Sequence, residues 1–167
     1  MKDEAKTQLE KIVRDYDEKL AEADRVDAAK RTAQAEFPAR FAGLKTTTIQ
    51  PAIQEIADML NEKGHRASLH EQEESSSAVG GVKSAAVSLR VVPKPFANRA
   101  SETNPSVIEV TFSANPGNRK IAVSSTNTMV GHGGSIGKRG EYEIDAVTAD
   151  VVAGHVIQTL SEAWGTR

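Results

Sequence analysis

The spacing of apolar residues changes twice along this chain, and no other feature constrains its fold as strongly. Up to Gly64 apolar residues recur every three or four positions, as on one face of an α-helix. Over residues 65–144 apolar and polar residues alternate, as in half-buried strands, and helical spacing returns over 145–165. The pattern predicts a single α+β domain spanning 1–167, with a helical N-terminal region at 1–64, an antiparallel sheet and a C-terminal helix packed on the sheet.

The N-terminal region is predicted to form two helices. Residues 4–35 contain neither Pro nor Gly and carry one narrow apolar stripe on an otherwise charged helix. A second helix accommodates Pro38 in its first turns, and the threonines at 46–48 followed by Pro51 predict a kink or break in it. A stripe this narrow packs on one partner only, either the next helix or a second copy of the chain. The stripe consists of Leu9, Ile12, Val13, Tyr16, Leu20 and Ala23.

Alternation predicts five strands in the middle of the chain, all of which can be joined by hairpins or loops. Segment 73–84, rich in Ser and Gly, is expected to be a long hairpin connection, and residues 115–118 a tight turn. The fifth strand is predicted as a short one, Gly140 to Ile144, after a glycine-rich loop. The polar side chains of the sheet either face water or line a groove, and the pattern leaves both open. They include Ser88, Arg90, Glu109 and Thr111.

The last helix is expected to be capped by Asp145 or Thr148 and to bury one face against the sheet. Val147, Val151 and Gly154 lie on the opposite side. Glycine inside a helix costs about 1 kcal/mol relative to alanine, so Gly154 indicates another backbone in close approach. The alternative is two surface valines and an incidental glycine. The face predicted to meet the sheet is Ala149, Val152, Ala153, Val156, Leu160, Ala163 and Trp164, with His155 near the edge of the outer face.

The glycine-rich segment 127–140 is the strongest candidate for a ligand site. Backbone amides in glycine-rich loops can converge on one anion, and two adjacent basic residues would add charge. The segment matches neither a Walker A loop nor a dinucleotide fingerprint, and a strand rather than a helix follows it. The alternative is a plain flexible loop. The candidate ligand residues are His132, Gly133, Gly134, Ser135, Lys138 and Arg139.

Composition argues against several other classes of function. The chain has no cysteine, which excludes disulfides and thiolate chemistry and favours a reducing compartment. Its four histidines show no metal-ligand spacing, no GxSxG elbow is present, and no cofactor is expected. A net charge of −2 and only 4% aromatic residues argue against nucleic-acid binding. No apolar run is long enough for a secretory signal or a membrane span, so cytoplasmic residence is expected.

Two hypotheses about function follow from these observations. The first is a non-catalytic cytoplasmic protein that works by binding or assembly, as a homodimer. The second is a domain that binds a small anionic ligand, with or without catalysis, through the 127–140 segment. No catalytic residue is proposed under either hypothesis. The residues expected to mediate self-association are Leu9, Ile12, Tyr16, Val147, Val151 and Gly154.

Overall fold

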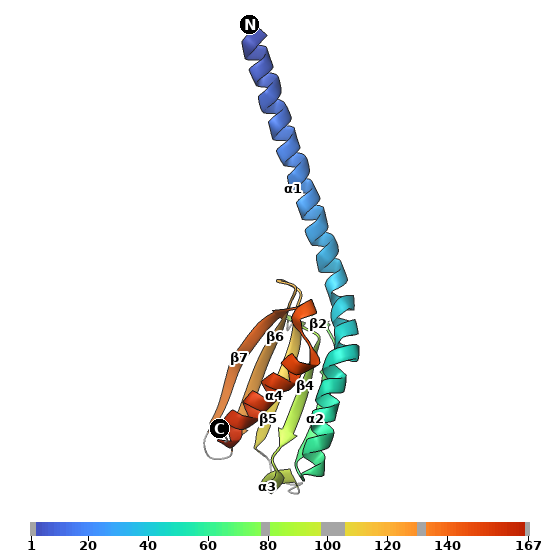
Figure 1. Cartoon of the computed structure of the whole chain (residues 1–167), viewed down its shortest axis with the longest axis vertical. Helices are drawn as coiled ribbons and strands as arrows, with labels where there is room; N and C mark the ends of the chain where they lie inside the picture. Colours follow the sequence, from blue (N-terminus) through green and yellow to red (C-terminus); the bar gives the residue numbers. More distant parts are fainter. Residues whose placement is uncertain (1–2, 78–80, 98–105, 130–132, 166–167) are drawn as a thin grey trace. The chain divides into compact units, whose positions relative to one another are not determined.

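The structure, a computed structural model, describes residues 3–77, 81–97, 106–129 and 133–165 (Figure 1). The chain forms two compact units, residues 1–37 and residues 38–167. The first is helical. The second contains a five-stranded antiparallel sheet and a C-terminal helix, so the predicted α+β class with an antiparallel sheet is confirmed.

The N-terminal region is helical throughout its described length. The prediction of two helices, the second one kinked, located the irregularity correctly, but the chain stays helical there and passes through Pro38 without ending. What changes is the hydrogen-bonding pattern, which becomes that of a π-helix for one turn. The elements are α1 (Asp3–Leu44), the π-helix η1 (Lys45–Ile49) and α2 (Gln50–Glu62).

The threonine run explains how the π turn is accommodated. The hydroxyls of Thr46 and Thr47 donate to the carbonyl oxygens of Ala42 and Gly43 at 3.0 and 2.9 Å. Pro51 has no amide hydrogen to donate to the carbonyl four residues earlier, so a regular α-helical ladder is interrupted at this point. A π turn combined with hydroxyl-to-carbonyl bonds keeps backbone groups hydrogen-bonded around the interruption.

The main sheet has the strand order β1-β4-β5-β6-β7, with each strand antiparallel to its neighbour. A separate two-stranded ribbon, β2 with β3, lies in the segment predicted as a plain connection. The strands are β1 (Arg66–Gln72), β2 (Ser75–Ser77), β3 (Gly81–Lys83), β4 (Ala86–Val92), β5 (Val107–Asn115), β6 (Lys120–Met129) and β7 (Gly133–Glu143). The remaining elements are the short helix α3 (Lys94–Ala97), the 3-10 turn η2 (Ile144–Ala146) and α4 (Ala149–Trp164).

The turn between β5 and β6 lies where the sequence places it. The side-chain oxygens of Asn115 and Asn118 accept hydrogen bonds from the amides of Gly117 and Lys120, both at 3.1 Å. The residue with positive φ is Arg119, at 58°, rather than a glycine. Asparagine side chains that bond the backbone two residues later are a common way to close such turns.

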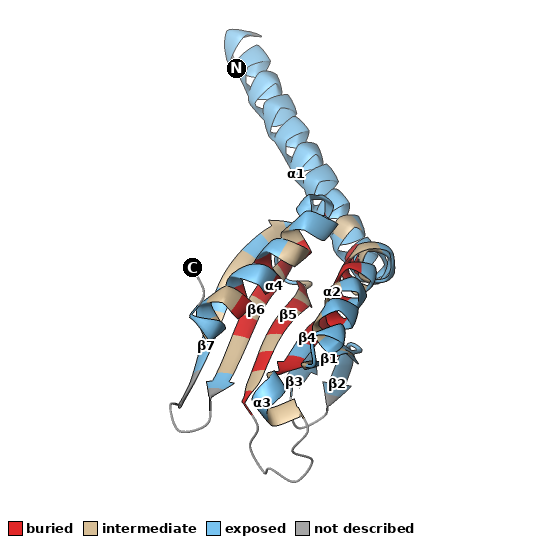
Figure 2. Cartoon of the chain, turned by 60° about the horizontal axis from the view of Figure 1, so that its bottom comes forward, coloured by how far each residue is buried: buried red, intermediate tan, exposed pale blue. Residues whose placement is uncertain are grey.

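Helices α2 and α4 lie over the same face of the sheet (Figure 2). On β5 every second residue is buried, and the helices contribute one apolar face each. These side chains form the core of the second unit. It includes Phe41, Ile49 and Ile53 from the helical region, Val87, Leu89, Val110, Phe112, Ile121 and Val123 from the sheet, and Val152, Val156 and Leu160 from α4.

Helix α4 begins as predicted, with the Thr148 hydroxyl accepting a hydrogen bond from the Val151 amide at 3.3 Å. Its buried face is rotated from the predicted one, because His155 and Thr159 are buried with the valines. The placement of His155 toward the outer face was therefore wrong. Ala149, expected on the buried face, is exposed.

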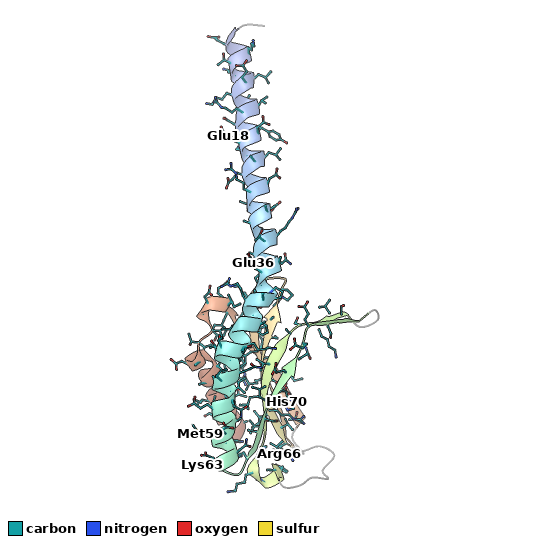
Figure 3. The ribbon with its side chains drawn as sticks, turned by 90° about the vertical axis from the view of Figure 1, so that its right-hand side faces the viewer. Glu18, Glu36, Met59, Lys63, Arg66 and His70 are labelled. Carbon is teal, nitrogen blue, oxygen red and sulfur yellow. The ribbon has the colours of Figure 1, made fainter. Side chains whose placement is uncertain are left out.

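The chain reverses direction between α2 and β1. Figure 3 shows Met59 and Lys63 near the end of α2, then Arg66 and His70 along β1. Gly64, with φ of 89°, makes the reversal in the backbone region that favours glycine. None of the helices in the described ranges has both the length and the apolar character needed to cross a membrane.

Candidate functional site

The glycine-rich segment proposed as a ligand loop is largely β-strand. β6 continues to Met129 and β7 starts at Gly133, and the two pair along their whole length. The predicted loop between 127 and 140 is therefore corrected to a long hairpin. Gly133, Gly134 and Ser135 lie in β7, and His132 lies outside the described residues.

Lys138 and Arg139 do not converge on one point. Because of a β-bulge between Val123 and Ser124, Arg139 has no residue directly opposite it in the backbone register of β6. Lys138 lies opposite Ser124. Lys138 Nζ lies 3.1 Å from Glu141 Oε2. This hydrogen bond, followed by one from Asn118, holds the pKa of Glu141 below its usual value.

Arg139 instead connects the sheet to α4. Its Nε donates to Ser125 Oγ and its guanidinium meets Glu162 Oε2, each at 2.6 Å. The bond from Arg139, and a second from Gln158, lower the pKa of the Glu162 carboxyl. Each basic side chain of the candidate anion site is thus already paired with a carboxylate, and the two serve different parts of the fold.

The predicted self-association residues fall into two groups. Leu9, Ile12 and Tyr16 on α1 are 52%, 64% and 64% exposed. Val147 is buried inside its own chain and so is not part of the surface, contrary to its predicted role. Val151 is half-buried.

Gly154 does not show the close backbone approach that the sequence suggested. It is exposed, and apart from its chain neighbours and the backbone of its own helix no heavy atom of the described residues lies within 4 Å of where its Cβ would be. The inferred cover over this part of α4 is therefore not provided by any of the residues that the structure describes.

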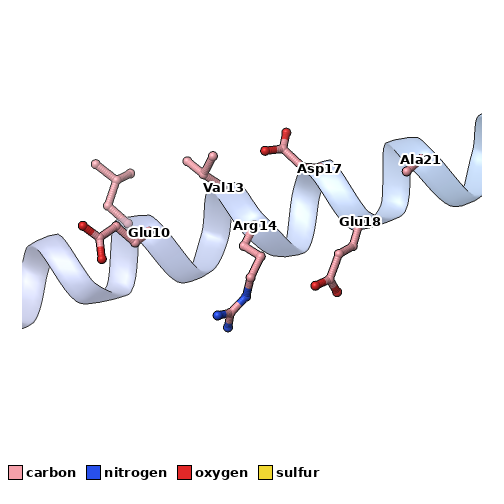
Figure 4. A pocket seen from close by; sticks show the side chains of 7 residues that line it. Glu10, Val13, Arg14, Asp17, Glu18 and Ala21 are labelled. Carbon is pink, nitrogen blue, oxygen red and sulfur yellow. The ribbon is translucent and has the colours of Figure 1, made fainter.

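The apolar stripe of α1 is exposed along its full length. Figure 4 shows part of this surface, a shallow hollow that is lined by α1 residues alone and includes Val13, Arg14 and Ala21. Large apolar side chains scattered singly on a surface are ordinary, but a continuous row of them is typical of an interaction surface. The exposed apolar residues in this row are Leu9, Ile12, Val13, Tyr16, Leu20 and Val26.

A second candidate site is a groove of about 400 Å³ on the outer face of the sheet, which lies opposite α2 and α4. Its floor is made of small side chains, with Ala86 and Ser88 from β4 only 7% and 6% exposed. Thr111 and Ser113 of β5 continue the floor. Of the two possibilities for the polar face, water or a groove, the structure has the groove.

The groove is rimmed by polar and charged side chains. The Ser88 hydroxyl donates to Glu109 Oε1 at 2.8 Å, which fixes the carboxylate at one end. Ser68 Oγ and His70 Nε2 are 3.0 Å apart, and Gln72 Nε2 donates to the Ser84 carbonyl at 2.7 Å. The sequence indicated the polar face but gave no sign of the groove's walls, because β1 and the 84–86 segment meet only in the folded sheet.

Lys45 is a further charged residue that the sequence did not single out. Its Nζ lies 3.0 Å from Glu71 Oε2 and 3.1 Å from Glu73 Oε1, and its side chain is only 12% exposed. These two hydrogen bonds, Glu71 first, raise the pKa of Lys45 above its ordinary value. These two ion pairs link η1 to the end of β1, and Lys45 neutralises the Glu71 carboxylate beside the groove.

The chain matches no protein-family model, no curated protein and no solved structure. Among the described residues, no group of three or more His, Asp or Glu side chains is arranged to hold a metal ion. The two surfaces described above, the α1 stripe and the outer groove, are therefore the features on which a functional hypothesis rests.

Proposed function

We propose that the protein is a non-catalytic cytoplasmic assembly protein that forms a homodimer through α1. The observation that supports this most directly is the row of large apolar side chains on α1, each at least 42% exposed. Covering such a row removes apolar surface from water, which stabilises association by roughly 25 cal/mol per Å².

The stripe has the spacing of a coiled-coil seam. Its members recur at alternating steps of four and three, the period of helices that pair by knobs-into-holes packing. The seam spans little more than two heptads, so we expect the pairing to be reversible and dependent on concentration. The seam positions are Leu9, Val13, Tyr16, Leu20 and Ala23.

Charges beside the seam favour a parallel pair. In parallel copies the flanking positions of Lys19 and Asp24 face each other across the interface, which gives two attractive contacts per dimer. Antiparallel copies would bring the acids on one flank, Glu10, Asp17 and Asp24, against each other. Charge complementarity therefore supports the proposal that a second copy of this chain, in parallel orientation, covers the stripe.

The test is sedimentation velocity over a concentration series with Leu20→Glu. Burying a leucine contributes about 1.5–3 kcal/mol, counted twice in a symmetric dimer, so the dissociation constant should rise about a hundredfold or more. Lys11→Gln, on the opposite side of α1, makes the same change in charge and should leave the constant unchanged. Equal association of Leu20→Glu and the wild type would contradict the proposal.

Orientation is tested by disulfide trapping, since the chain has no native cysteine. In a parallel pair Ala23→Cys places two thiols opposite each other at the seam, and mild oxidation should give a covalent dimer. Glu18→Cys, on the outer side of the helix, should remain largely monomeric on a denaturing gel. Failure of the Ala23→Cys variant to cross-link under conditions where the wild type dimerises would exclude the parallel arrangement.

A further inference from the structure

The outer groove combines a positive and a negative group that lie side by side. Arg90 of β4 and Glu109 of β5 are direct partners in the antiparallel register, and both line the groove. Cα atoms of such partners are about 4.5–5.5 Å apart. The two side chains are therefore neighbours at the groove's rim.

The two charges are not paired with each other. Glu109 accepts its hydrogen bond from Ser88. Within the part of the chain that the structure describes, no carboxylate lies within ion-pair distance of the Arg90 guanidinium. A guanidinium and a carboxylate held next to each other without a mutual ion pair leave both available to a ligand that carries the opposite charges.

The rest of the lining restricts the class of ligand. It contains no Phe, Tyr or Trp side chain, and its one ring, the imidazole of His70, lies within hydrogen-bond distance of the Ser68 hydroxyl, so the lining offers little surface on which a base or a sugar ring could stack. Arg90 is its one fixed positive charge, while its other acid, Glu71, is occupied by Lys45. A polyanion would meet Glu109 with like charge, and the groove volume is in the lower range of small-molecule sites.

We propose that this groove binds a small zwitterion of the α-amino acid class. The ligand's carboxylate accepts hydrogen bonds from Arg90, and its ammonium donates to the Glu109 carboxylate that Ser88 orients. The hydroxyls of Thr111 and Ser113 lie along the floor, where they can bond a short polar side chain. This site is independent of the α1 seam and does not depend on dimerisation.

The experiment is a titration of the full-length protein with each of the twenty common amino acids, followed by two-dimensional NMR. We expect saturable shifts at residues of β4 and β5 with at least one of them. Propionate, which lacks the ammonium, and ethylamine, which lacks the carboxylate, should each bind at least about tenfold more weakly than alanine or the best ligand. Equal binding of propionate would reduce the site to a simple anion site and overturn the proposal.

Variants locate the site. Arg90→Gln and Glu109→Gln should each weaken binding about tenfold or more, while Arg90→Lys should retain part of it because the charge is kept. Lys138→Gln, on the same face of the sheet but outside the groove, should bind like the wild type. The spectra also report whether each variant is folded. Absence of saturable shifts with every amino acid at about 10 mM, or undiminished binding by both folded Gln variants, would sink the proposal.

Discussion

His155 is an ionisable side chain held between α4 and the sheet. It is 9% exposed, its Nε2 lies 2.7 Å from the Tyr142 hydroxyl, and its ring meets Phe112 and Tyr142 edge-on. Burial, and then the positive charge of Arg139, lower its pKa below the usual value of 6.5. Glu162 is paired with Arg139 nearby.

Acid should therefore destabilise the protein through His155. Because its folded-state pKa is lower than its unfolded-state pKa, the unfolded chain binds the proton first as pH falls below about 6.5. The free energy of unfolding should be level above that pH and decrease below it until the folded-state pKa is reached. Urea unfolding between pH 8 and about pH 5 measures this.

A non-titrating replacement isolates the histidine's contribution. His155→Gln keeps a polar group near the Tyr142 hydroxyl, so its stability should vary less with pH in this range even if the protein is less stable at pH 8. An unchanged slope in His155→Gln would assign the acid sensitivity to other groups.

For the secondary-structure elements, sequence periodicity predicts strands correctly where the side chains are large, and it fails where glycines have no side chain. β4 and β5 were located because branched apolar residues alternate with polar ones in both. β7 was mistaken for a loop because four of its eleven residues are glycine, which carries no side chain to show alternation. Its pairing comes from backbone hydrogen bonds to β6, which a glycine strand makes as well as any other.

The candidate sites show the same division. The α1 stripe was visible in the sequence because it belongs to one helix with a regular spacing. The groove was only half visible: Ser88, Arg90, Glu109 and Thr111 were grouped on one face, but its depth depends on small residues beside larger ones on neighbouring strands. That relation needs the strand order β1-β4-β5, which alternation does not determine.

The end of α4 is fastened to the turn between α2 and β1 by a ring stack. His65 and Trp164 have centroids 4.9 Å apart and an interplanar angle of 19°. His65 Nδ1 also accepts a hydrogen bond from the Lys94 amide at 3.1 Å. One side chain thus joins three elements, α4, α3 and the start of β1.

Removing this ring should loosen the last turn of α4. We expect His65→Ala to lower the free energy of unfolding by about 0.5–1.5 kcal/mol for the stack, with a further contribution from the lost acceptor. His65→Phe keeps the stack but not the acceptor and should lose less. Fluorescence of the single tryptophan, with urea unfolding, follows both variants. Identical emission and stability in all three proteins would show that the stack contributes nothing.

On the scale of the whole molecule, stability and assembly are expected to reside in different units. The core residues from Phe41 to Leu160 belong to the unit at 38–167. Side chains at positions 4–32 are all exposed, so they contribute little buried surface to the monomer. Burial of apolar surface is the main source of folding free energy, and it is concentrated in the second unit.

Deleting residues 2–32 should therefore separate the two properties. The shortened chain should unfold at the same urea concentration as the wild type, within error, since the buried residues are retained. It should also sediment as a monomer at every concentration at which the full chain dimerises. Circular dichroism and sedimentation velocity measure the two effects, and a shortened chain that is unfolded would show that the N-terminal segment contributes to the fold.

Because positions 4–32 are exposed, the effect of substitutions in this segment should depend mainly on its contacts with other molecules. No side chain there is constrained by the monomer's own interior, so tolerance to substitution along it depends on helix propensity and on what binds it. Saturation mutagenesis should therefore find positions that do not tolerate substitution at helical spacing, and only on the face that a partner contacts. The positions that are sensitive would identify the side of the helix that faces the partner, without any structure of the complex.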